Sequence, residues 1–180
     1  SGEQGVAAQA ARLGMQWTVF RPTLIYGAGI DRSLTPIVAR AQRVRLFPIP
    51  MTHGMRQPVH ADDIAQAVLA ALRSDAAAGR VLEIGGGERL DYMAMFRRVH
   101  ASVGRRTLPL YLPLWALRLL AASVPRARGP VSRLEQDLIA DNGALLSLLG
   151  VRPRPFRPDP TTWQPMTPEQ ARKRVGGGAR

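Results

Sequence analysis

The first half of the chain alternates amphipathic helical stretches with short apolar runs. Residues 3–13 are rich in alanine and contain no proline, which predicts a helix that ends at Gly14. Residues 17–20 are β-branched and aromatic, and they predict a strand. A helix, a tight glycine turn and an apolar strand make up half of a crossover unit, so this pattern indicates a parallel sheet.

The same alternation continues over the next fifty residues. Ser33 is a suitable N-cap for a helix over 33–43, and residues 57–60 predict a second strand. Asp62 then occupies an N-cap position before a helix over 64–73. The apolar positions of that helix share one stripe and are Ile64, Val68, Leu69 and Leu72.

A third strand is predicted at residues 80–84, where it ends at three consecutive glycines. We expect it to pair in parallel with the strand at 17–20, whose other edge is then left bare. Three more helices are predicted further along the chain. They cover residues 91–103, 113–124 and 131–149.

Proline content rises sharply after residue 151 and leaves little room for regular structure. We therefore divide the chain into one folded unit over 1–156 and a disordered tail rich in Pro, Arg and Gly over 157–180. The prolines in question are Pro153, Pro155, Pro158, Pro160, Pro165 and Pro168.

Composition limits the classes of protein. With 180 residues, 46% of them hydrophobic, the chain is long enough for one domain with its own core. The absence of cysteine excludes disulfides and thiolate metal sites. No basic segment followed by an apolar one begins the chain as in a signal peptide, so we expect a cytoplasmic protein.

The formal net charge of +12 and the pI of about 11.6 would by themselves favour a nucleic-acid partner. The basic residues are nearly all arginine, however, with Lys173 the single lysine, and they are scattered along the chain. No helix-turn-helix, zinc or base-stacking signature accompanies them. We therefore predict no nucleic-acid partner.

The most hydrophobic stretch covers residues 108–124. It is 17 residues long and contains Pro109, Pro113 and Arg118, whereas a membrane-spanning helix needs about 20 apolar residues without an interior charge. A packed or interfacial helix is the better interpretation. Because arginines flank the stretch, peripheral contact with a membrane surface stays open.

Two motifs carry the chemistry. In the first, at residues 21–27, an apolar strand leads into Arg-Pro-Thr-Leu-Ile-Tyr-Gly, and the loop after a parallel strand faces the ligand crevice. Pro22 ends the strand, and its neighbours can offer backbone groups and the Thr23 hydroxyl to a ligand. The alternative is a simple proline turn. The second motif, Arg-Gln-Pro-Val-His-Ala-Asp-Asp-Ile-Ala, covers residues 56–65, and we interpret His60 as a residue that fixes the turn.

In this order the two motifs resemble the C-terminal half of an extended or atypical short-chain dehydrogenase/reductase of the NAD-dependent epimerase/dehydratase family. The similarity covers about residues 3–156, so the chain is interpreted as the C-terminal portion of a longer protein. It implies an α/β fold, namely the C-terminal part of a Rossmann-like doubly wound parallel sheet with a mostly helical substrate-binding lobe. Atypical members related to a complex I accessory subunit look most similar.

The resemblance also implies roles for four residues. Pro22 and Thr23 match the loop that lies against the nicotinamide of NAD or NADP, and Leu24 matches a position beside the substrate. Arg56 matches an arginine that pairs with a substrate diphosphate in nucleotide-sugar members, where a guanidinium fork suits phosphate oxygens. The alternative is that Arg56 is a solvated charge on the protein surface with no role in binding. Leu24 departs from the sugar-nucleotide epimerases, which usually carry Asn there.

The reactive pair of that family, a tyrosine followed four residues later by a lysine, does not occur in these residues. The residues four positions after the three tyrosines are Ile30, Phe96 and Trp115. The triplet Gly85–Gly87 fits neither a dinucleotide fingerprint nor a Walker loop, so we interpret it as a structural turn. We expect no catalytic and no metal-binding residue in this segment.

Two functions follow as hypotheses. The chain is either the C-terminal fragment of an NAD(P)-dependent epimerase, dehydratase or reductase, or part of a non-catalytic NAD(P)-binding scaffold. The first predicts a small-molecule substrate, which a nucleotide-linked compound would satisfy. Because members often dimerise through two helices, a homodimer stays open. The isolated chain is expected to be poorly soluble or molten and to bind NAD(P) negligibly, since an apolar strand edge is exposed.

Overall fold

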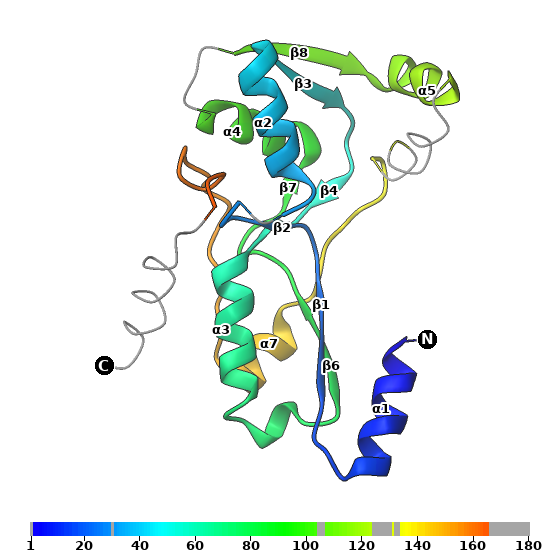
Figure 1. Ribbon diagram of the computed structural model, residues 1–180, viewed down its shortest axis with the longest axis vertical. Helices are drawn as coiled ribbons and strands as arrows, with labels where there is room; N and C mark the ends of the chain where they lie inside the picture. The colour runs from blue at the N-terminus through cyan, green and yellow to red at the C-terminus, as the bar shows by residue number, and fades with distance from the viewer. Residues whose placement is uncertain (1, 30, 104–106, 124–130, 132–133, 166–180) are drawn as a thin grey trace.

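The chain folds into two lobes joined by a narrow waist, as the computed structural model in Figure 1 shows. Helices and strands from distant parts of the sequence meet in each lobe, so neither lobe is one continuous segment. The structure describes residues 2–29, 31–103, 107–123, 131 and 134–165.

The lower lobe is built on one parallel strand pair. Strand β1 (Thr18–Pro22) pairs with β6 (Arg80–Ile84), in a register that sets Thr18 opposite Arg80. Helices α3 (Ala61–Ala71) and α7 (Gly143–Leu149) lie beside the pair, and α1 (Gly2–Leu13) precedes it. The predicted parallel pairing is confirmed. Within the described residues β1 pairs only with β6, so its other edge is bare.

The lower lobe buries little apolar surface, and part of its apolar surface stays exposed. The predicted stripe on α3 is partly wrong, because Ala67 is buried while Leu72 is 79% exposed. A groove of about 230 Å³ between β1 and α3 is lined by apolar side chains, among them Trp17, Phe20 and Leu72, and by the polar Gln16, Thr18 and Ser74. The buried members of the lower core are Val59, Ala67, Ile84, Leu145 and Val151.

The upper lobe contains a second parallel pair that the sequence did not reveal. Strand β3 (Leu46–Met51) pairs with β8 (Leu108–Pro113) over six residues. Helices α2 (Leu34–Val44) and α4 (Tyr92–Ser102) pack with this pair, and α5 (Leu114–Ser123) follows β8. The substrate-binding lobe was predicted to be mostly helical. The structure adds this two-stranded parallel sheet to it.

The apolar stretch at 108–124 is a strand followed by a helix. The helix predicted at 113–124 is confirmed as α5, but the interpretation of the whole stretch as one helix is wrong. Pro109 and Pro113 explain the division, because proline lacks an N–H and does not fit a helix interior. At an edge strand such as β8 the missing donor on the unpaired side costs nothing.

The upper core is larger than the lower core and includes part of the segment expected to be disordered. The Trp163 side chain is buried there, and its Nε1 donates a hydrogen bond to Ser102 Oγ at 2.9 Å. The folded unit therefore extends beyond the predicted boundary at residue 156; residues 166–180 of the predicted tail lie outside the described residues. The largest buried members of this core are Tyr26, Phe47, Ile49, Met95, Phe96, Phe156 and Trp163.

Short strands cross the waist. Strand β2 (Ile25–Tyr26) pairs in parallel with β5 (Val59–His60), and β4 (Met55–Arg56) pairs antiparallel with β7 (Leu90–Asp91). Of the strand predicted at 57–60, only Val59 and His60 form a strand, β5, while Gln57 and Pro58 connect it to β4.

Of the helix predicted over 131–149, Val131 is helical, residues 132–133 lie outside the described residues, residues 134–142 are not helical, and residues 143–149 form α7. Leu138 lies in an isolated bridge with Arg56, and its N–H donates to the Met55 carbonyl at 2.8 Å. The Leu138 carbonyl accepts the Gln57 N–H at 3.2 Å. Because these backbone groups pair with β4 and the residue after it, they are not available to a helix.

The first turns of α2 and α3 are capped by side chains, but in both helices the capping residue differs from the predicted one. The Asp31 carboxylate, not Ser33, accepts the N–H groups at the start of α2, including that of Leu34 at 2.6 Å. At α3 the cap is His60, whose Nδ1 accepts the Asp62 N–H at 3.1 Å. The interpretation of His60 as a residue that fixes the turn is therefore confirmed.

Candidate functional site

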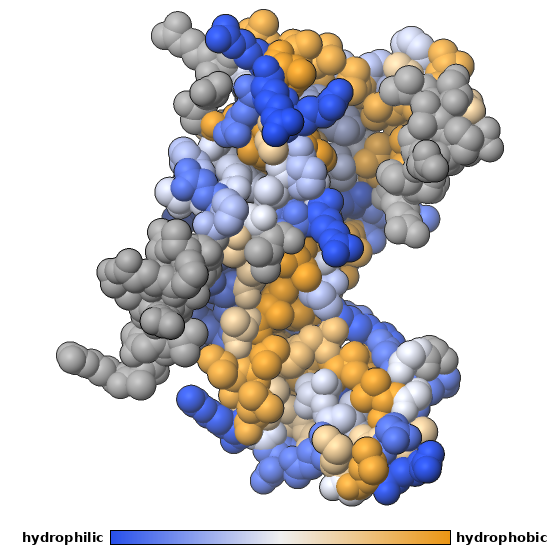
Figure 2. Space-filling view, in the orientation of Figure 1, coloured by the Kyte–Doolittle hydropathy of each residue, from blue (hydrophilic) through white to orange (hydrophobic). Residues whose placement is uncertain are grey.

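The carboxyl ends of β1 and β6 meet at the waist, between the two lobes. In an open parallel sheet this edge is where a ligand crevice forms. Two loops border it here, residues 22–24 after β1 and residues 85–87 after β6. The space-filling surface narrows at this level (Figure 2).

The loop after β1 is held by hydrogen bonds from Thr23. Its N–H donates to the Ile84 carbonyl at 3.0 Å, and its hydroxyl donates to the Gln57 carbonyl. The Leu24 carbonyl accepts the Val59 N–H at 2.9 Å, while the Leu24 side chain packs on the upper core. Pro22 is the last residue of β1, opposite Ile84. The Thr23 oxygen, already a donor, keeps lone pairs that can accept from a ligand.

Gln57 connects the two loops, and sequence reasoning missed it. Its side chain is buried; Nε2 donates to the Gly86 carbonyl at 2.8 Å, and Oε1 accepts the Ala140 N–H at 2.9 Å. Its own carbonyl accepts from Gly86 and from the Thr23 hydroxyl. A buried amide with all these groups paired rigidifies the edge. The sequence offered one indication of this role, because Gln57 is a single amide side chain at the start of a short predicted strand.

The glycine triplet after β6 is a close-packed turn, as its structural interpretation requires. A Cβ on Gly86 would lie 1.9 Å from the Pro58 carbonyl oxygen, and one on Gly87 would lie 2.3 Å from the Pro153 oxygen. Asn142 completes the turn, because its Oδ1 accepts the Gly85 N–H at 2.9 Å and its Nδ2 donates to the Gly85 carbonyl. Backbone at such distances excludes any side chain.

A shallow cavity opens beside this turn. Its volume is about 310 Å³, and its lining includes Gln57, Arg89, Asn142 and Arg152. The Arg89 guanidinium donates to the Ala140 carbonyl at 3.3 Å, so it is fixed in part. The cavity combines two arginines with two side-chain amides and the Asp141 carboxylate.

Arg56 is the last residue of β4 and precedes Gln57. Its guanidinium donates to the carbonyls of Gln136 and, at 3.1 Å, Leu134, and its Cζ lies 4.7 Å from the centroid of the Tyr92 ring. Burial lowers the pKa of Arg56 from its ordinary value and also raises the pKa of Tyr92. No described contact joins Arg56 to Thr23. The role of Arg56 in substrate binding stays a prediction.

A polar cluster surrounds the start of α3. Asp63 is 3% exposed, and its carboxylate accepts the backbone N–H of Arg154 at 2.9 Å and its Nε at 2.8 Å. The His60 ring stands edge-on to Tyr26, with centroids 5.0 Å apart. Burial, followed by the charge of Asp63, raises the pKa of Tyr26 to about 12.

This cluster borders a second, polar cavity of about 440 Å³. Arg154, Arg157 and the Thr161 and Thr162 side chains line it together with Tyr26. The cavity is closed on one side by the segment that packs Phe156 and Trp163 into the upper core. Asp63 and Arg154 thus connect the lower lobe to that segment.

The chain is similar to known proteins in sequence and in fold. The sequence model described as the NAD dependent epimerase/dehydratase family matches residues 1–85. A UDP-glucose 4-epimerase of Vibrio cholerae is 22% identical over 154 residues, which is 84% of this chain and 46% of that enzyme.

Solved structures give the same fold. The UDP-glucuronic acid 4-epimerase of Bacillus cereus in complex with NAD superposes with a TM-score of 0.66 at 16% identity, over 96% of this chain and 50% of that one. The epimerase Mth375 of Methanothermobacter thermautotrophicus gives 0.65 at 18% identity, over 89% and 46%. The chain spans about half the length of the relatives it matches.

The fold is therefore an α/β arrangement of the Rossmann type, with parallel strand pairs and flanking helices, as predicted from the sequence. By sequence, residues 1–85 are similar to the NAD dependent epimerase/dehydratase family, and by fold the chain is similar to about half of a solved epimerase.

Replacing Gly86 by Ala tests the close approach of the waist backbone. The added methyl would meet the Pro58 carbonyl, so we expect a loss of about 3 kcal/mol in the free energy of unfolding. The matched control is Gly5→Ala in α1, where a Cβ meets nothing within 4 Å and should add about 0.5 to 1 kcal/mol. Urea denaturation of both variants measures the difference; equal stability of the two would contradict the packing described.

The Asp63–Arg154 contact predicts unequal effects at two adjacent carboxylates. Asp63→Asn removes the charge from a buried group with two donors, and a loss of about 2 kcal/mol is expected. Asp62→Asn changes a more exposed carboxylate whose contact with Arg154 is 3.6 Å, and should cost less than about 1 kcal/mol. Thermal unfolding at neutral pH distinguishes the two variants. A larger effect at Asp62 would be the contrary result.

Arg56→Met tests whether the guanidinium supports the waist. The variant leaves the carbonyls of Leu134 and Gln136 without their donor, so a loss of about 2 to 3 kcal/mol is expected. Arg89→Met, with one bond at 3.3 Å, is the control and should lose less than about 1 kcal/mol. Urea denaturation measures both. Unchanged stability of Arg56→Met would instead favour a ligand role for this side chain.

Proposed function

We propose that this chain supplies the last sheet strands and the substrate lobe of an NAD(P)-dependent epimerase, dehydratase or reductase. The observation that supports the proposal is the parallel pair β1–β6, whose bare edge and exposed apolar groove leave a place for further strands of the same sheet. The relatives that it matches are about twice as long as the chain. NAD or NADP would bind mainly to that other half.

Four residues carry the proposed contacts. The loop at Pro22 and Thr23 would face the nicotinamide, because it follows a parallel strand at the edge where this fold binds ligands. Its backbone is fixed in advance by Thr23, which reduces the entropy lost on binding. Leu24 and Arg56 would contribute to the substrate side.

The substrate proposed is a small, nucleotide-linked molecule. Two of the similar proteins are named for UDP-glucose and UDP-glucuronic acid. The cavity at Arg89 and Arg152 offers two cations against the one carboxylate of Asp141, and a guanidinium suits the oxygens of a diphosphate. Leu24 favours a less polar group at the position where sugar-nucleotide epimerases usually have Asn.

Proton transfer would come from residues outside these 180. The chain has one lysine, Lys173, and it follows none of the three tyrosines at a spacing of four. Tyr26, with its pKa raised to about 12, is held neutral and is a poor base. The chain would thus position the cofactor and the substrate rather than react with them.

A non-catalytic NAD(P)-binding scaffold is the second proposal. It is favoured by the departure at Leu24. The gene sequence just upstream of Ser1 distinguishes the two. A tyrosine four residues ahead of a lysine there supports the enzyme, and its absence supports the scaffold.

Cofactor binding gives a direct measurement. Calorimetric titration of the 180-residue chain with NADH and NADPH should show no saturable binding at about 1 mM or tighter, because the glycine-rich loop is missing. The same chain extended upstream to include such a loop should bind at micromolar concentrations. Tight binding by a compact monomer of the 180 residues alone would contradict the proposal.

A further inference from the structure

Seven described arginines lie on or beside the helices of the upper lobe. Arg32, Arg40, Arg43 and Arg45 belong to α2 and its ends, and Arg97, Arg98 and Arg118 belong to α4 and α5. Two of them are paired, Arg98 with Glu88 and Arg118 with Glu135.

Part of this charge lies beside the outer strand pair. Helix α2 ends at Arg45, which takes a left-handed conformation with φ of 58° and leads directly into β3. The Arg45 carbonyl accepts the Leu108 N–H at 2.9 Å, so Arg45 also adjoins the start of β8. Arg43 is exposed in the last turn of α2. The described residues show no ion pair for Arg43 or Arg45.

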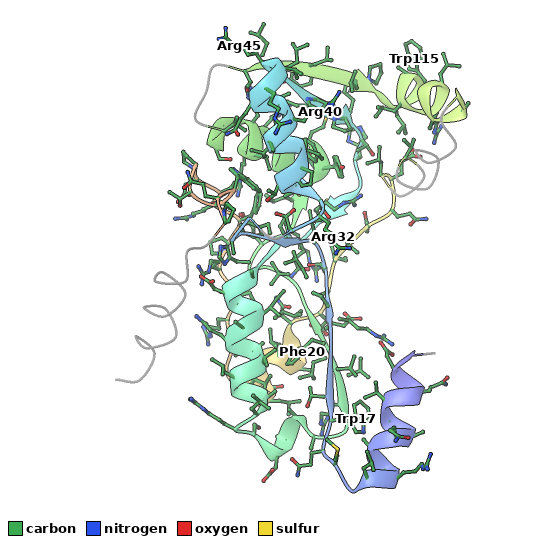
Figure 3. All side chains as sticks on the ribbon, in the orientation of Figure 1. Trp17, Phe20, Arg32, Arg40, Arg45 and Trp115 are labelled. Atoms are coloured by element: carbon green, nitrogen blue, oxygen red, sulfur yellow. The ribbon has the colours of Figure 1, made fainter. Side chains whose placement is uncertain are left out.

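The strands and helix next to these arginines expose large apolar side chains. Leu108 is 69% exposed, and Trp115 and Leu119 on α5 are 70% and 67% exposed. Leu46 and Leu110 are also exposed, because α2 and α4 cover only the opposite face of the strand pair, where Phe47 and Ile49 are buried. Figure 3 shows Arg45 and Trp115 at the same end of the molecule, near opposite ends of β8. Figure 2 shows hydrophilic and hydrophobic side chains adjacent there.

We propose that this surface docks on an anionic lipid bilayer. We define the basic-apolar surface by Arg43, Arg45, Leu46, Leu108, Leu110, Trp115 and Leu119. Anionic headgroups would complement the arginines, and the leucines and Trp115 would enter the boundary between headgroups and acyl chains. None of the described helices is long and apolar enough to cross a membrane, so the contact is peripheral.

The charge of the basic-apolar surface and its exposed apolar side chains together favour a bilayer over a second copy of the chain or a nucleic acid. A second copy of the chain would bring two uncompensated positive surfaces together, which like-charge repulsion opposes. A nucleic acid would complement the arginines but would gain nothing from exposed leucines. A lipid surface satisfies both features.

Because the isolated 180 residues are expected to be poorly soluble, the test uses the longer protein proposed to contain them and measures its flotation with vesicles in a density gradient. Vesicles of phosphatidylcholine with phosphatidylglycerol should retain the protein, and vesicles of phosphatidylcholine alone should not. R43Q/R45Q should weaken binding roughly 25-fold, because each basic residue near an anionic surface contributes about fivefold. W115S/L119S should weaken it at least about tenfold through lost apolar insertion.

Two control variants on the lower lobe match these changes. R12Q/R73Q alters the net charge by the same amount, and L13S/L72S removes two exposed apolar side chains, 60% and 79% exposed. Both controls should bind anionic vesicles as the unaltered protein does. Circular dichroism of all variants confirms that folding is retained.

Three results would overturn the proposal. The first is equal flotation with neutral and anionic vesicles or with neither, and the second is an equal loss in the control variants. The third is that R43Q/R45Q weakens binding both to vesicles and to a DNA duplex while W115S/L119S changes nothing. That pattern would assign the arginines to a polyanion and not to a bilayer.

Discussion

The contact of Gly86 with Pro58 is the constraint on which the two lobes depend. Gly86 ends the lower sheet, and Pro58 lies between the short strands that lead up to the other lobe. Only backbone fits between them, so the turn after β6 and the loop after β1 are fixed relative to the waist. Gln57 completes the contact from both sides, with a side chain that bonds Gly86 and Ala140 and a carbonyl that accepts from Thr23. Rigid loops at the carboxyl edge of a sheet are what ligand positioning requires.

Local pattern was sufficient to predict the lower lobe. The residues of α1, α3 and the β1–β6 pair have helical or strand periodicity and clear glycine ends, and these elements form where expected. The cap of α3 could not be assigned in this way, because His60 and Asp62 both satisfy capping chemistry and only the backbone direction at β5 decides between them.

The upper lobe depended on contacts between distant residues, which no local pattern contains. Strands β3 and β8 are separated by more than fifty residues and are rich in proline, so each resembles a loop or a helix when considered alone. Their pairing follows from burial of Phe47 and Ile49 beneath α2 and α4. The same reasoning applies to Gln57, Asn142 and Trp163, whose roles arise from partners 29 to 83 residues away.

Several acidic side chains of the protein have structural partners in the backbone. The carboxylates of Asp31, Asp63, Glu88 and Asp91 all accept backbone N–H groups, so they lie where helix ends or segment crossings need an acceptor. Arginines such as Arg43 and Arg45 have no comparable role within the described contacts, and uncompensated positive charge destabilises a folded chain through self-repulsion. An external anionic surface would relieve that repulsion while covering Leu108 and Trp115. Because the basic-apolar surface lies at the far end of the upper lobe from the carboxyl edge of β1 and β6, docking there would leave the proposed cofactor crevice accessible.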